Sequence, residues 1–418
     1  MYYKKISAKN RILVCQFRSI VPHIHEYYFQ SPMFLIFSAN SRSKFLIQER
    51  LPFLFLSILF MQSNSFLLYG ANGYTGVLIA KYAAQYGLQP ILAGRREEAI
   101  KPLADELKLS HAIIDLDNAA QLKEALQKVK LVVHAAGPFA DTAMQMISAC
   151  LQTGTHYLDI NGDISVFEMI KSFDAKAKEK NIMLMPGVGF DVVPTDCMAL
   201  YLKNKLPDAT HLKLAFASIG GGVSHGTAMT IVSRLGEGGA SRQNGKIVRE
   251  PIAKKGLWID FGEKKLFVMS IPWGDISTAY FTTGIPNIET YTGVNPIVYK
   301  IMKMQWLFNG FLKLEWVKNM IRKKIKNRPA GPSDEMRNKA KAMIWGEVRN
   351  AKGEKIGHHF TCADGYTLTA HSSLIIAKKV LEGNFKPGYQ TPASCYGEEL
   401  VNEIPGTINN LTNESQKK

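Results

Sequence analysis

The residues best suited to chemistry stand between positions 65 and 96, in the stretch SFLLYGANGYTGVLIAKYAAQYGLQPILAGRR. Three glycines, Gly70, Gly73 and Gly76, follow a short apolar run and open a helical pattern, which predicts a strand, a tight turn and a helix. Glycine suits this turn because a Cβ atom would hold a pyrophosphate away from the amides at the positive end of the helix dipole. The residues predicted to contact a dinucleotide here are Gly70, Asn72, Gly73, Tyr74, Thr75 and Gly76. The glycines taken alone are equally typical of an ordinary strand-to-helix turn.

The next predicted strand, residues 90–93, ends in Gly94, Arg95 and Arg96. An NAD-selective site usually has an acidic side chain at this place, which binds the ribose hydroxyls. Two guanidinium groups stand here instead, and a bidentate cation matches a 2′-phosphate. We therefore predict that the cofactor is NADP(H) and that Arg95 and Arg96 contact it.

A later strand end is predicted to border the nicotinamide, because ligands of parallel sheets bind beyond the carboxyl ends of the strands. The apolar run 131–135 leads into Ala136, Gly137 and Pro138, small residues that would allow the ring to approach closely. A strand-to-helix turn without a ligand is the alternative interpretation of these three residues.

Hydride transfer also needs a proton source beside an acceptor carbon held about 3 to 3.5 Å from the nicotinamide. Asp163 follows one predicted strand end and Asp191 the next, in the loop PGVGFDVVPTD. Helix capping is an equally good role for Asp163. Tyr201 stands four residues before Lys205, and a lysine can lower a phenol pKa. The predicted catalytic candidates are Asp191, Asp163 and Tyr201.

Short apolar runs alternate with helical patterns through the first half of the chain. The strand-like runs are 66–69, 90–93, 111–114, 131–135, 156–160 and 182–185. The helical patterns are 97–107, 119–129, 142–153 and 165–180. Strands separated by helices pair in parallel. We therefore predict an α/β fold, a Rossmann-type doubly wound parallel sheet over residues 65–205.

The alternation changes after position 205, which predicts a second α+β domain with an antiparallel sheet. Its expected strands are 211–218, 265–271, 342–349 and 355–362, the last two forming a hairpin. We assign residues 206–364 to this substrate domain. Residues 365–418 are expected to supply C-terminal helices, including 372–381, that return to the first domain and end in a disordered tail.

Within the second domain, residues 295–329 combine nine Lys or Arg with one Glu and many apolar side chains. An apolar face with a cationic end is typical of a helix at a membrane interface or over a lipid cavity. A helix buried against its own domain, with a solvated basic end, is equally compatible with the pattern.

The composition is that of a globular protein, with 46% hydrophobic and 21% charged residues. The formal net charge of +16 is spread without a nucleic-acid-binding motif, so a nucleic-acid partner is not expected. The five cysteines lack a CxxC pair, which favours a reducing compartment and argues against a metal site. We expect a cytoplasmic protein with peripheral membrane attachment.

Residues 1–64 are expected to be an extension outside the fold. Residues 1–60 are basic and aromatic, and their apolar run 51–60 is too short to span a bilayer. They also lack the order of a signal peptide. Met61 is therefore predicted as the natural start, and a membrane-attaching segment is the alternative.

The segments YGANGYTG, AGRR, AAGPF, HYLDINGD and PGVGFDVVPTD resemble, in order and spacing, the saccharopine dehydrogenase-like NADP-binding oxidoreductases. GVSHGTA, MIWGEVR, GYTLTA and QTPA resemble the branch that includes trans-acting enoyl reductases, although His225 departs from the small residue expected there. The resemblance implies reduction of lipid-like enoyl groups, and lipid-droplet or membrane association in some members. It also implies that Gly70, Gly73, Gly76 and Arg95 hold the cofactor while Gly137 and Pro138 border the nicotinamide.

Three functions are compatible with these observations. The first is an NADP(H)-dependent oxidoreductase that reduces an enoyl or related group on a hydrophobic substrate. The second is a saccharopine-type dehydrogenase of amino-acid-derived imines, whose carboxylates would require Arg or Lys in the cleft. The third is a non-catalytic NADP-binding scaffold on lipid surfaces.

Overall fold

The computed structural model describes residues 65–307, 309–408 and 411. The predictions made for residues 1–64, including the start at Met61, lie outside this part, as does most of the predicted C-terminal tail.

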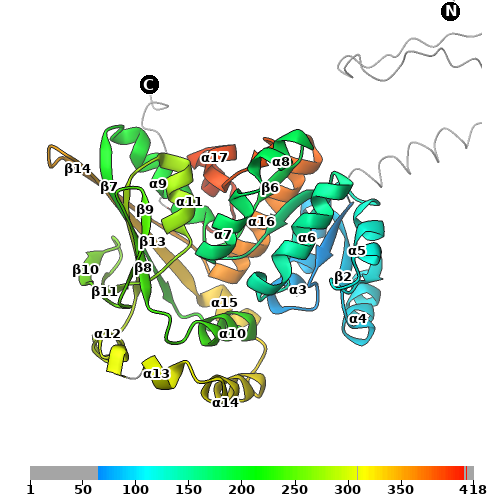
Figure 1. Cartoon of the computed structure of the whole chain (residues 1–418), viewed down its shortest axis with the longest axis horizontal. Helices are drawn as coiled ribbons and strands as arrows, with labels where there is room; N and C mark the ends of the chain where they lie inside the picture. The colour runs from blue at the N-terminus through cyan, green and yellow to red at the C-terminus, as the bar shows by residue number, and fades with distance from the viewer. Residues whose placement is uncertain (1–64, 308, 409–410, 412–418) are drawn as a thin grey trace, which may run out of the picture. The chain divides into compact units, whose positions relative to one another are not determined.

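Six strands of the first half of the described chain and one strand near its C-terminus form a seven-stranded sheet in which all neighbouring strands are parallel (Figure 1). The spatial order of the strands is β15-β6-β5-β4-β1-β2-β3. Their bounds are β1 Ser65–Tyr69, β2 Gln89–Gly94, β3 His111–Ile113, β4 Leu131–His134, β5 His156–Asp159, β6 Met183–Met185 and β15 Gly388–Tyr389. This order confirms the doubly wound prediction, and the two-residue β15 extends the sheet at its β6 edge.

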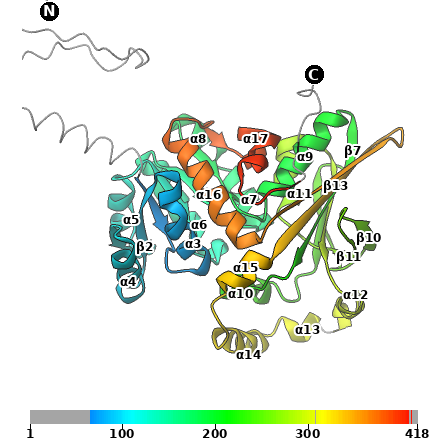
Figure 2. The same ribbon diagram turned by 180° about the vertical axis from the view of Figure 1, so that it is seen from behind.

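Helices cover both faces of this sheet (Figures 1 and 2). One face packs Phe66 and Leu68 of β1 against α3, α9 and α16, and the other packs Leu67 and Tyr69 against α5, α6 and α7. The helix bounds are α3 Tyr74–Tyr82, α4 Glu97–Leu107, α5 Ala119–Leu126, α6 Phe139–Thr153, α7 Ile164–Lys171, α8 Asp174–Glu179, α9 Val193–Lys205 and α16 Gly365–Leu381, with the 3₁₀ helix η1 at Ala83–Tyr86. The pattern at 165–180 thus forms two helices, because α7 ends at Lys171 and α8 begins at Asp174.

The second sheet has eight strands and is mixed. Six strands follow the order β10-β11-β12-β7-β13-β14, and β8 joins β12 to β9. The bounds are β7 Ala209–Ile219, β8 Gly239–Gln243, β9 Lys246–Glu250, β10 Gly256–Asp260, β11 Lys265–Ser270, β12 Asn287–Gly293, β13 Lys341–Asn350 and β14 Lys355–Ala363. The predicted β13–β14 hairpin is present. The antiparallel prediction is corrected at one pair, since β12 runs parallel to β7.

Two helices join the sheets, and further helices follow the second sheet. Helix α9 packs its Met198 and Leu202 so closely on β13 that a Cβ at Gly346 would lie 2.6 Å from Met198 Cγ. Helix α16 packs on α3 of the first domain. The remaining helices are α10 His225–Ser233, α11 Asp275–Thr283, α12 Pro296–Lys303, η2 Gln305–Leu307, α13 Asn309–Leu312, α14 Glu315–Lys326, α15 Asp334–Lys339, α17 Pro392–Tyr396 and η3 Glu398–Glu403.

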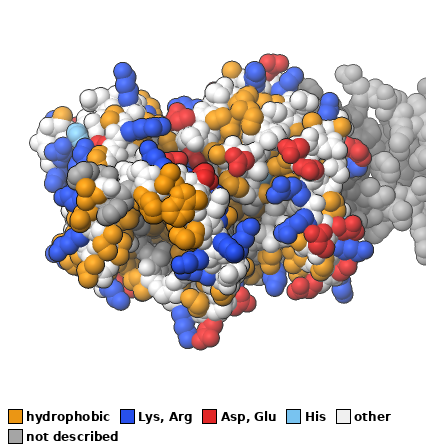
Figure 3. Space-filling view, turned by 60° about the horizontal axis from the view of Figure 1, so that its bottom comes forward, with side chains coloured by type: hydrophobic (Ala, Val, Ile, Leu, Met, Phe, Trp, Pro, Cys, Tyr) orange, Lys and Arg blue, Asp and Glu red, His pale blue; other side chains and the backbone are white. Residues whose placement is uncertain are grey.

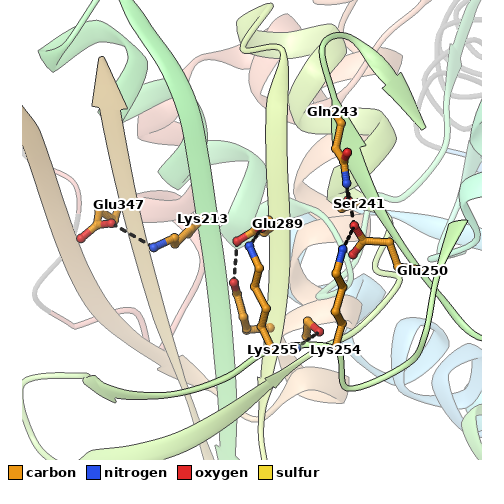
Figure 4. A network of polar contacts seen from close by, with 10 residues as sticks. Lys213, Ser241, Gln243, Glu250, Lys254, Lys255, Glu289 and Glu347 are labelled. Carbon is orange, nitrogen blue, oxygen red and sulfur yellow. Dashed lines mark hydrogen bonds and ion pairs between the residues drawn. The ribbon is translucent and has the colours of Figure 1, made fainter. Parts of the chain in front are cut away.

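A row of polar contacts crosses the face of the second sheet that bears Lys213 of β7 (Figure 4). Lys213 Nζ lies 3.5 Å from Glu347 Oε1 of β13, and Glu289 of β12 binds Lys255. Tyr291 donates a 2.6 Å hydrogen bond to the same Glu289. The opposite face carries Leu212 and Leu214, which join the main hydrophobic core. The alternation along β7 therefore directs one face toward the first domain, while the other face carries the polar contacts at Lys213 and a hydrophobic cluster around Ala215 and Ala217.

Candidate active site

The first turn of the parallel sheet requires glycine for steric reasons. Gly70 has a φ of +85°, and a Cβ on it would lie 2.6 Å from the backbone nitrogen of Ala136. A Cβ on Gly76 would lie 2.3 Å from the carbonyl oxygen of Gly70. These contacts bring the β1 turn, the end of β4 and the start of α3 close together. The glycines are therefore needed by the fold as well as by the predicted cofactor site.

The start of α3 leaves its first amides without a capping side chain. Gly73 is the N-cap residue, and the first helical bond runs from Val77 N to Gly73 O, 2.9 Å. The amides of Tyr74, Thr75 and Gly76 therefore have no acceptor within the helix. Together with the helix dipole they favour an anion at this end of α3.

The side chain of Tyr74 contacts the second domain. Its hydroxyl donates to Pro332 O at 2.5 Å and accepts from Arg337 Nη1 at 2.8 Å, while its ring meets Tyr366 edge-on at 4.9 Å. Gly331 is required beside it, because a Cβ there would lie 2.5 Å from the ring. Because the Tyr74 side chain is engaged by these contacts, only the backbone amide of Tyr74 is available to bind a cofactor.

Arg95 and Arg96 are both exposed at the end of β2, and neither forms an ion pair with another described residue. Burial raises the pKa of Tyr69 to about 12, and the charge of Arg95 opposes this rise. Arg95 is therefore close enough to the end of β1 for its charge to act on Tyr69. Asn72 is close by, since its Oδ1 would be 3.2 Å from a Cβ on Gly94. These positions leave both guanidinium groups available for a phosphate.

The end of β4 is held by a hydrogen-bonded group that the sequence did not point to. Thr142 donates to Ala136 O at 2.8 Å and bonds His134 Nε2 at 2.9 Å. Burial lowers the pKa of His134 to about 3, so this imidazole is neutral. Gly137 and Pro138 beyond it are exposed, and Pro138 is the N-cap residue of α6.

Asp163 acts as a structural carboxylate. It caps α7 by accepting from Ser165 N at 2.9 Å, and it forms an ion pair with Arg234 at the end of α10. Burial alone would raise the pKa of Asp163, but Arg234 and the Ser165 hydrogen bonds lower it. An ionised carboxylate has no proton to donate at neutral pH. The capping interpretation therefore describes Asp163 better than the prediction that it serves as a catalytic acid.

Asp191 lies in the loop that follows β6, at the carboxyl edge of the parallel sheet. Its Oδ2 would lie 2.3 Å from a Cβ on Gly162 of the β5 loop, so the carboxyl rests directly on that backbone. The residue is half-buried, and no described group hydrogen-bonds to its carboxyl. Burial raises the pKa of Asp191 to about 6, with Arg234 opposing the rise. Asp191 can therefore exchange a proton close to neutral pH.

Tyr201 lies away from this edge. It is the ninth residue of α9, so it stands about 12 Å along the helix axis from Val193. Its ring is buried 5.0 Å from the ring of His358, and Lys205 lies over its face at 5.4 Å. The structure thus does not bring Tyr201 together with Asp191, and Lys205 approaches the ring rather than supporting a proton donor.

Two further aspartates adjoin Asp191. Asp196 lies in the PGVGFDVVPTD loop that sequence analysis pointed to, whereas sequence analysis missed Asp275. Asp275 at the start of α11 is fully buried, and neither of its carboxyl oxygens has a hydrogen-bond partner. Thr195 lies beside it, but this hydroxyl donates to Val192 O at 3.1 Å. Burial and the nearby Asp196 and Asp191 raise the pKa of Asp275 far above its ordinary value. Full burial without a hydrogen-bond partner therefore favours the protonated, neutral form of Asp275.

Asp196 is also buried but has partners. It accepts hydrogen bonds from Thr282 Oγ1 at 2.6 Å and from Ala393 N at 2.8 Å. Burial still raises its pKa, to about 6. The described part of the site therefore combines four aspartates with Arg234, whose charge is engaged by Asp163.

An aromatic wall continues from Asp191 into the second domain. Phe190 meets Phe216 of β7 edge-on at 5.5 Å, and Phe216 meets Trp273 at 4.6 Å. All three side chains are half-buried. Gly274 seats this segment on the first domain, because a Cβ there would lie 2.6 Å from Phe167 of α7. The arrangement places an apolar surface beside the proton-exchanging Asp191.

No group of His, Cys, Asp and Glu side chains suited to a metal ion occurs in the part of the chain that the structure describes. The polar groups of the site are thus hydrogen-bond donors and carboxyls. The turn between β1 and α3, which is suited to a pyrophosphate, lies at the same carboxyl edge of the sheet. This arrangement fits a dinucleotide whose reactive ring points toward β4, β5 and β6.

Comparison with known proteins agrees with this geometry. Residues 66–185 match the family model of the saccharopine dehydrogenase NADP binding domain. The chain is 26% identical to a saccharopine dehydrogenase-like oxidoreductase of Rattus norvegicus over 202 residues, 42% of this chain and 47% of that protein. It is 26% identical to a trans-acting enoyl reductase of Mycobacterium ulcerans over 140 residues, 31% of this chain and 33% of that protein. The chain thus spans about half the length, or less, of these curated relatives.

A longer match and a solved structure extend the comparison. The chain is 24% identical to a lipid droplet localized protein of Caenorhabditis elegans over 289 residues, 62% of this chain and 67% of that protein. Apo saccharopine dehydrogenase (L-Glu forming) from Saccharomyces cerevisiae shares the fold, with a TM-score of 0.58 and 12% identity over 81% of this chain and 96% of that one. The match to the saccharopine dehydrogenase NADP binding domain covers the part of the chain that forms β1 to β6 of the parallel sheet.

Proposed function

We propose that the protein is an NADP(H)-dependent oxidoreductase acting on a neutral, apolar substrate, with an enoyl group as the favoured acceptor. The observation that carries the proposal is the pairing of uncapped α3 amides with the exposed Arg95 at the end of the neighbouring β2. A pyrophosphate suits the first and a 2′-phosphate the second. The relatives named as oxidoreductases and enoyl reductases support the same reaction class.

The charge of the site favours a neutral substrate over an imino acid. Asp191, Asp196 and Asp275 adjoin one another, and the nearby cations Arg234 and Arg242 are paired with Asp163 and Glu168. A substrate carboxylate would meet no unpaired guanidinium or ammonium group described there, and Asp191 and Asp196 would repel it once they ionise above about pH 6. The saccharopine-type alternative therefore lacks the basic side chains that it requires.

In this proposal bound NADPH supplies the hydride, and Asp191 supplies the proton. The half-buried carboxyl can be protonated near neutral pH and stands at the strand edge where the substrate would be reduced. Asp163 keeps Arg234 in place, and Arg234 in turn moderates the proton affinity of Asp191. The Phe190 side of the wall excludes water from the acceptor carbon.

The cofactor preference is tested by calorimetry of NADPH and NADH binding. Wild type should bind NADPH at least tenfold more tightly, and Arg95→Asp should abolish that ratio. Arg249→Asp, at an exposed arginine of β9, is the matched control and should keep it. Tighter binding of NADH by wild type would contradict the assignment of Arg95.

Turnover assays separate the three candidate functions. Each assay follows NADPH oxidation with an enoyl ester or with an imino dicarboxylate as the acceptor. Reduction of the enoyl ester supports the proposal, whereas reduction of the imino acid alone would establish the saccharopine-type reaction. NADPH binding without turnover of either substrate would favour the scaffold.

We also propose that an anionic lipid surface contacts the chain along α12, α13 and α14. The similarity to a relative named as a lipid droplet localized protein supports this proposal. Apolar side chains are exposed in this segment: Ile297, Val298, Ile301, Met304, Leu307, Phe311, Leu314, Trp316 and Met320. Figure 3, which brings this side forward, shows hydrophobic and basic side chains intermixed. Val317 and Ile325 are buried, so α14 packs on its domain with one face and exposes the other.

None of the described helices is long and apolar enough to cross a bilayer. The proposed contact is therefore peripheral, and it depends on apolar insertion and on the charges of residues 295–329. The side chains of Trp306 and Phe308, which the pattern also includes, lie outside the described residues.

Flotation with phosphatidylserine-containing liposomes tests the lipid contact. The variant Ile301→Ser, Phe311→Ser, Trp316→Ser should float several-fold less than wild type. Met144→Ser, at an exposed apolar residue of α6 in the other domain, should float as wild type does. Equal flotation of wild type and the triple variant would reject the contact.

A further inference from the structure

We propose that one neutral acyl chain, an ester or thioester, binds along a row of half-buried side chains that leads from Asp191 to α12. This inference rests on the proposed function and names the substrate class of the same site. The acyl row is defined as Phe190, Phe216, Trp273, Val294, Tyr299 and Met302.

The first part of the acyl row is fixed beside the proton donor. Phe190 directly precedes Asp191, and its amide donates to Thr369 Oγ1 of α16 at 3.0 Å. Gly365 lies against it, since a Cβ there would be 3.1 Å from Phe190 Cγ. The ring is thus held by α16 on one side and meets Phe216 on the other.

The middle of the row contains an unused hydrogen-bond donor. Trp273 contacts Phe216 through its ring, while its indole Nε1 is buried and has no acceptor. A buried donor without an acceptor is costly, so a ligand oxygen placed there would be favourable. Among apolar side chains, an ester or thioester carbonyl is an oxygen acceptor that carries no charge. This orphan N–H is the observation that favours an acyl derivative over a plain hydrocarbon.

The far part of the row reaches the exposed surface of α12. Phe216 and Trp273 pack around Met269 and Ile271 together with Val294, Tyr299 and Met302. Tyr299 and Met302 lie on α12, whose Ile297 and Ile301 are exposed. A chain entering over α12 would therefore keep apolar contact until it reached Asp191.

The charges at the two ends select the form of the chain. Asp191, Asp196 and Asp275 stand at the inner end, and Lys300 and Lys303 are exposed at the outer end. Above about pH 6, where Asp191 and Asp196 ionise, a free fatty acid would be repelled by the inner end and retained by the lysines. A neutral ester or thioester can place its reacting carbons at Asp191 without that cost.

The test measures the binding of methyl esters of 8, 12 and 16 carbons by displacement of a fluorescent acyl ester in the presence of NADPH. Affinity should rise about twofold to fourfold per methylene until the acyl row is filled. Phe216→Ser should weaken the 16-carbon ester at least tenfold, and the conservative Phe216→Leu by less than threefold. Trp273→Phe should weaken the esters about fivefold and leave an alkane of equal length unchanged. Trp345→Phe, outside the acyl row, is the control.

Each outcome has a defined meaning. Affinity independent of chain length, or equal losses in Trp273→Phe and Trp345→Phe, would overturn the acyl row. If a short enoyl ester is nevertheless reduced with NADPH, the proposed function survives that failure. If long esters bind as expected but no enoyl ester is reduced, the acyl row stands and the oxidoreductase proposal fails. NADPH affinity measured on every variant shows whether the fold is retained.

Discussion

The two ends of the candidate site are built differently. At the cofactor end, backbone meets backbone, and the Cβ positions of Gly70 and Gly76 would lie 2.6 and 2.3 Å from main-chain atoms. At the substrate end, side chains meet side chains, and ring centroids lie 4.6 to 5.5 Å apart along Phe190, Phe216 and Trp273. Backbone contacts of this kind tolerate no substitution, whereas packed rings can be exchanged for others of similar volume. The cofactor end is thus the rigid part of the site, and the substrate end is where specificity can vary.

The largest expected effect is that of Gly76→Ala, which tests the rigidity of the cofactor end. The added methyl would lie 2.3 Å from Gly70 O, and the backbone must move to accept it. We expect a loss of about 3 kcal/mol in the free energy of unfolding and loss of NADPH binding. Urea denaturation and calorimetry measure both. Gly310→Ala, where no atom lies within 4 Å of the new Cβ, is the control. Similar stability of the two variants would remove the contrast between the two ends.

Asp275→Asn tests the substrate end through its pH dependence. The raised pKa means that native Asp275 keeps a proton that the unfolded chain releases above about pH 4, so this residue costs stability as the pH rises. The variant should therefore become more stable relative to wild type between pH 4 and pH 7, by up to about 1.4 kcal/mol per pH unit. Urea denaturation at several pH values measures this difference. A difference that does not change with pH would mean that native Asp275 is ionised.

The third effect concerns the pH profile of turnover. Arg234 opposes the raised pKa of Asp191 and neutralises Asp163, while Asp196 and Asp275 face the same region. Arg234→Met removes that positive charge, so the pKa of Asp191 should rise further. A proton donor loses activity as pH rises through its pKa, and the alkaline limb should therefore move upward by about half to one pH unit.

Arg322→Met, at a cation of α14 that pairs with Glu315, is the matched control for this shift. Its alkaline limb should coincide with that of wild type. An unmoved limb in Arg234→Met would show that the titrating proton donor is a group other than Asp191.

The same contrast explains what could be predicted from the sequence. The six predicted strands of the first sheet and the turn of Gly70, Gly73 and Gly76 follow from local patterns, because each element carries its own periodicity and breakers. The role of Asp163 as the α7 cap was also open to local reasoning. Such features depend on neighbours in the sequence.

The remaining features depend on contacts between distant segments. Asp275 and Trp273 lie in the short stretch IPWGD, whose pattern predicts no chemistry, and become notable only beside residues 190 and 191. Sequence analysis did not predict β12, and its parallel pairing with β7 joins segments more than 60 residues apart. Tyr201 matched a spacing, but the helix carries it into the core beside His358.

The smallest expected effect is at the polar contacts of the second sheet, which involve neither the backbone contacts of the turn nor the rings of the acyl row. Lys213 and Glu347 are 3.5 Å apart and retain 38% and 25% of their side-chain exposure (Figure 4). Solvent screening should limit their coupling to about 0.5 kcal/mol or less. A double-mutant cycle of Lys213→Met and Glu347→Gln, measured by urea denaturation, gives this coupling energy. A second double-mutant cycle on an exposed pair provides the reference: Glu124 of α5 and Lys128, which follows this helix. A coupling above about 1.5 kcal/mol would show that this polar face, too, constrains the fold beneath the substrate end, because pairs at ordinary surfaces do not reach that value.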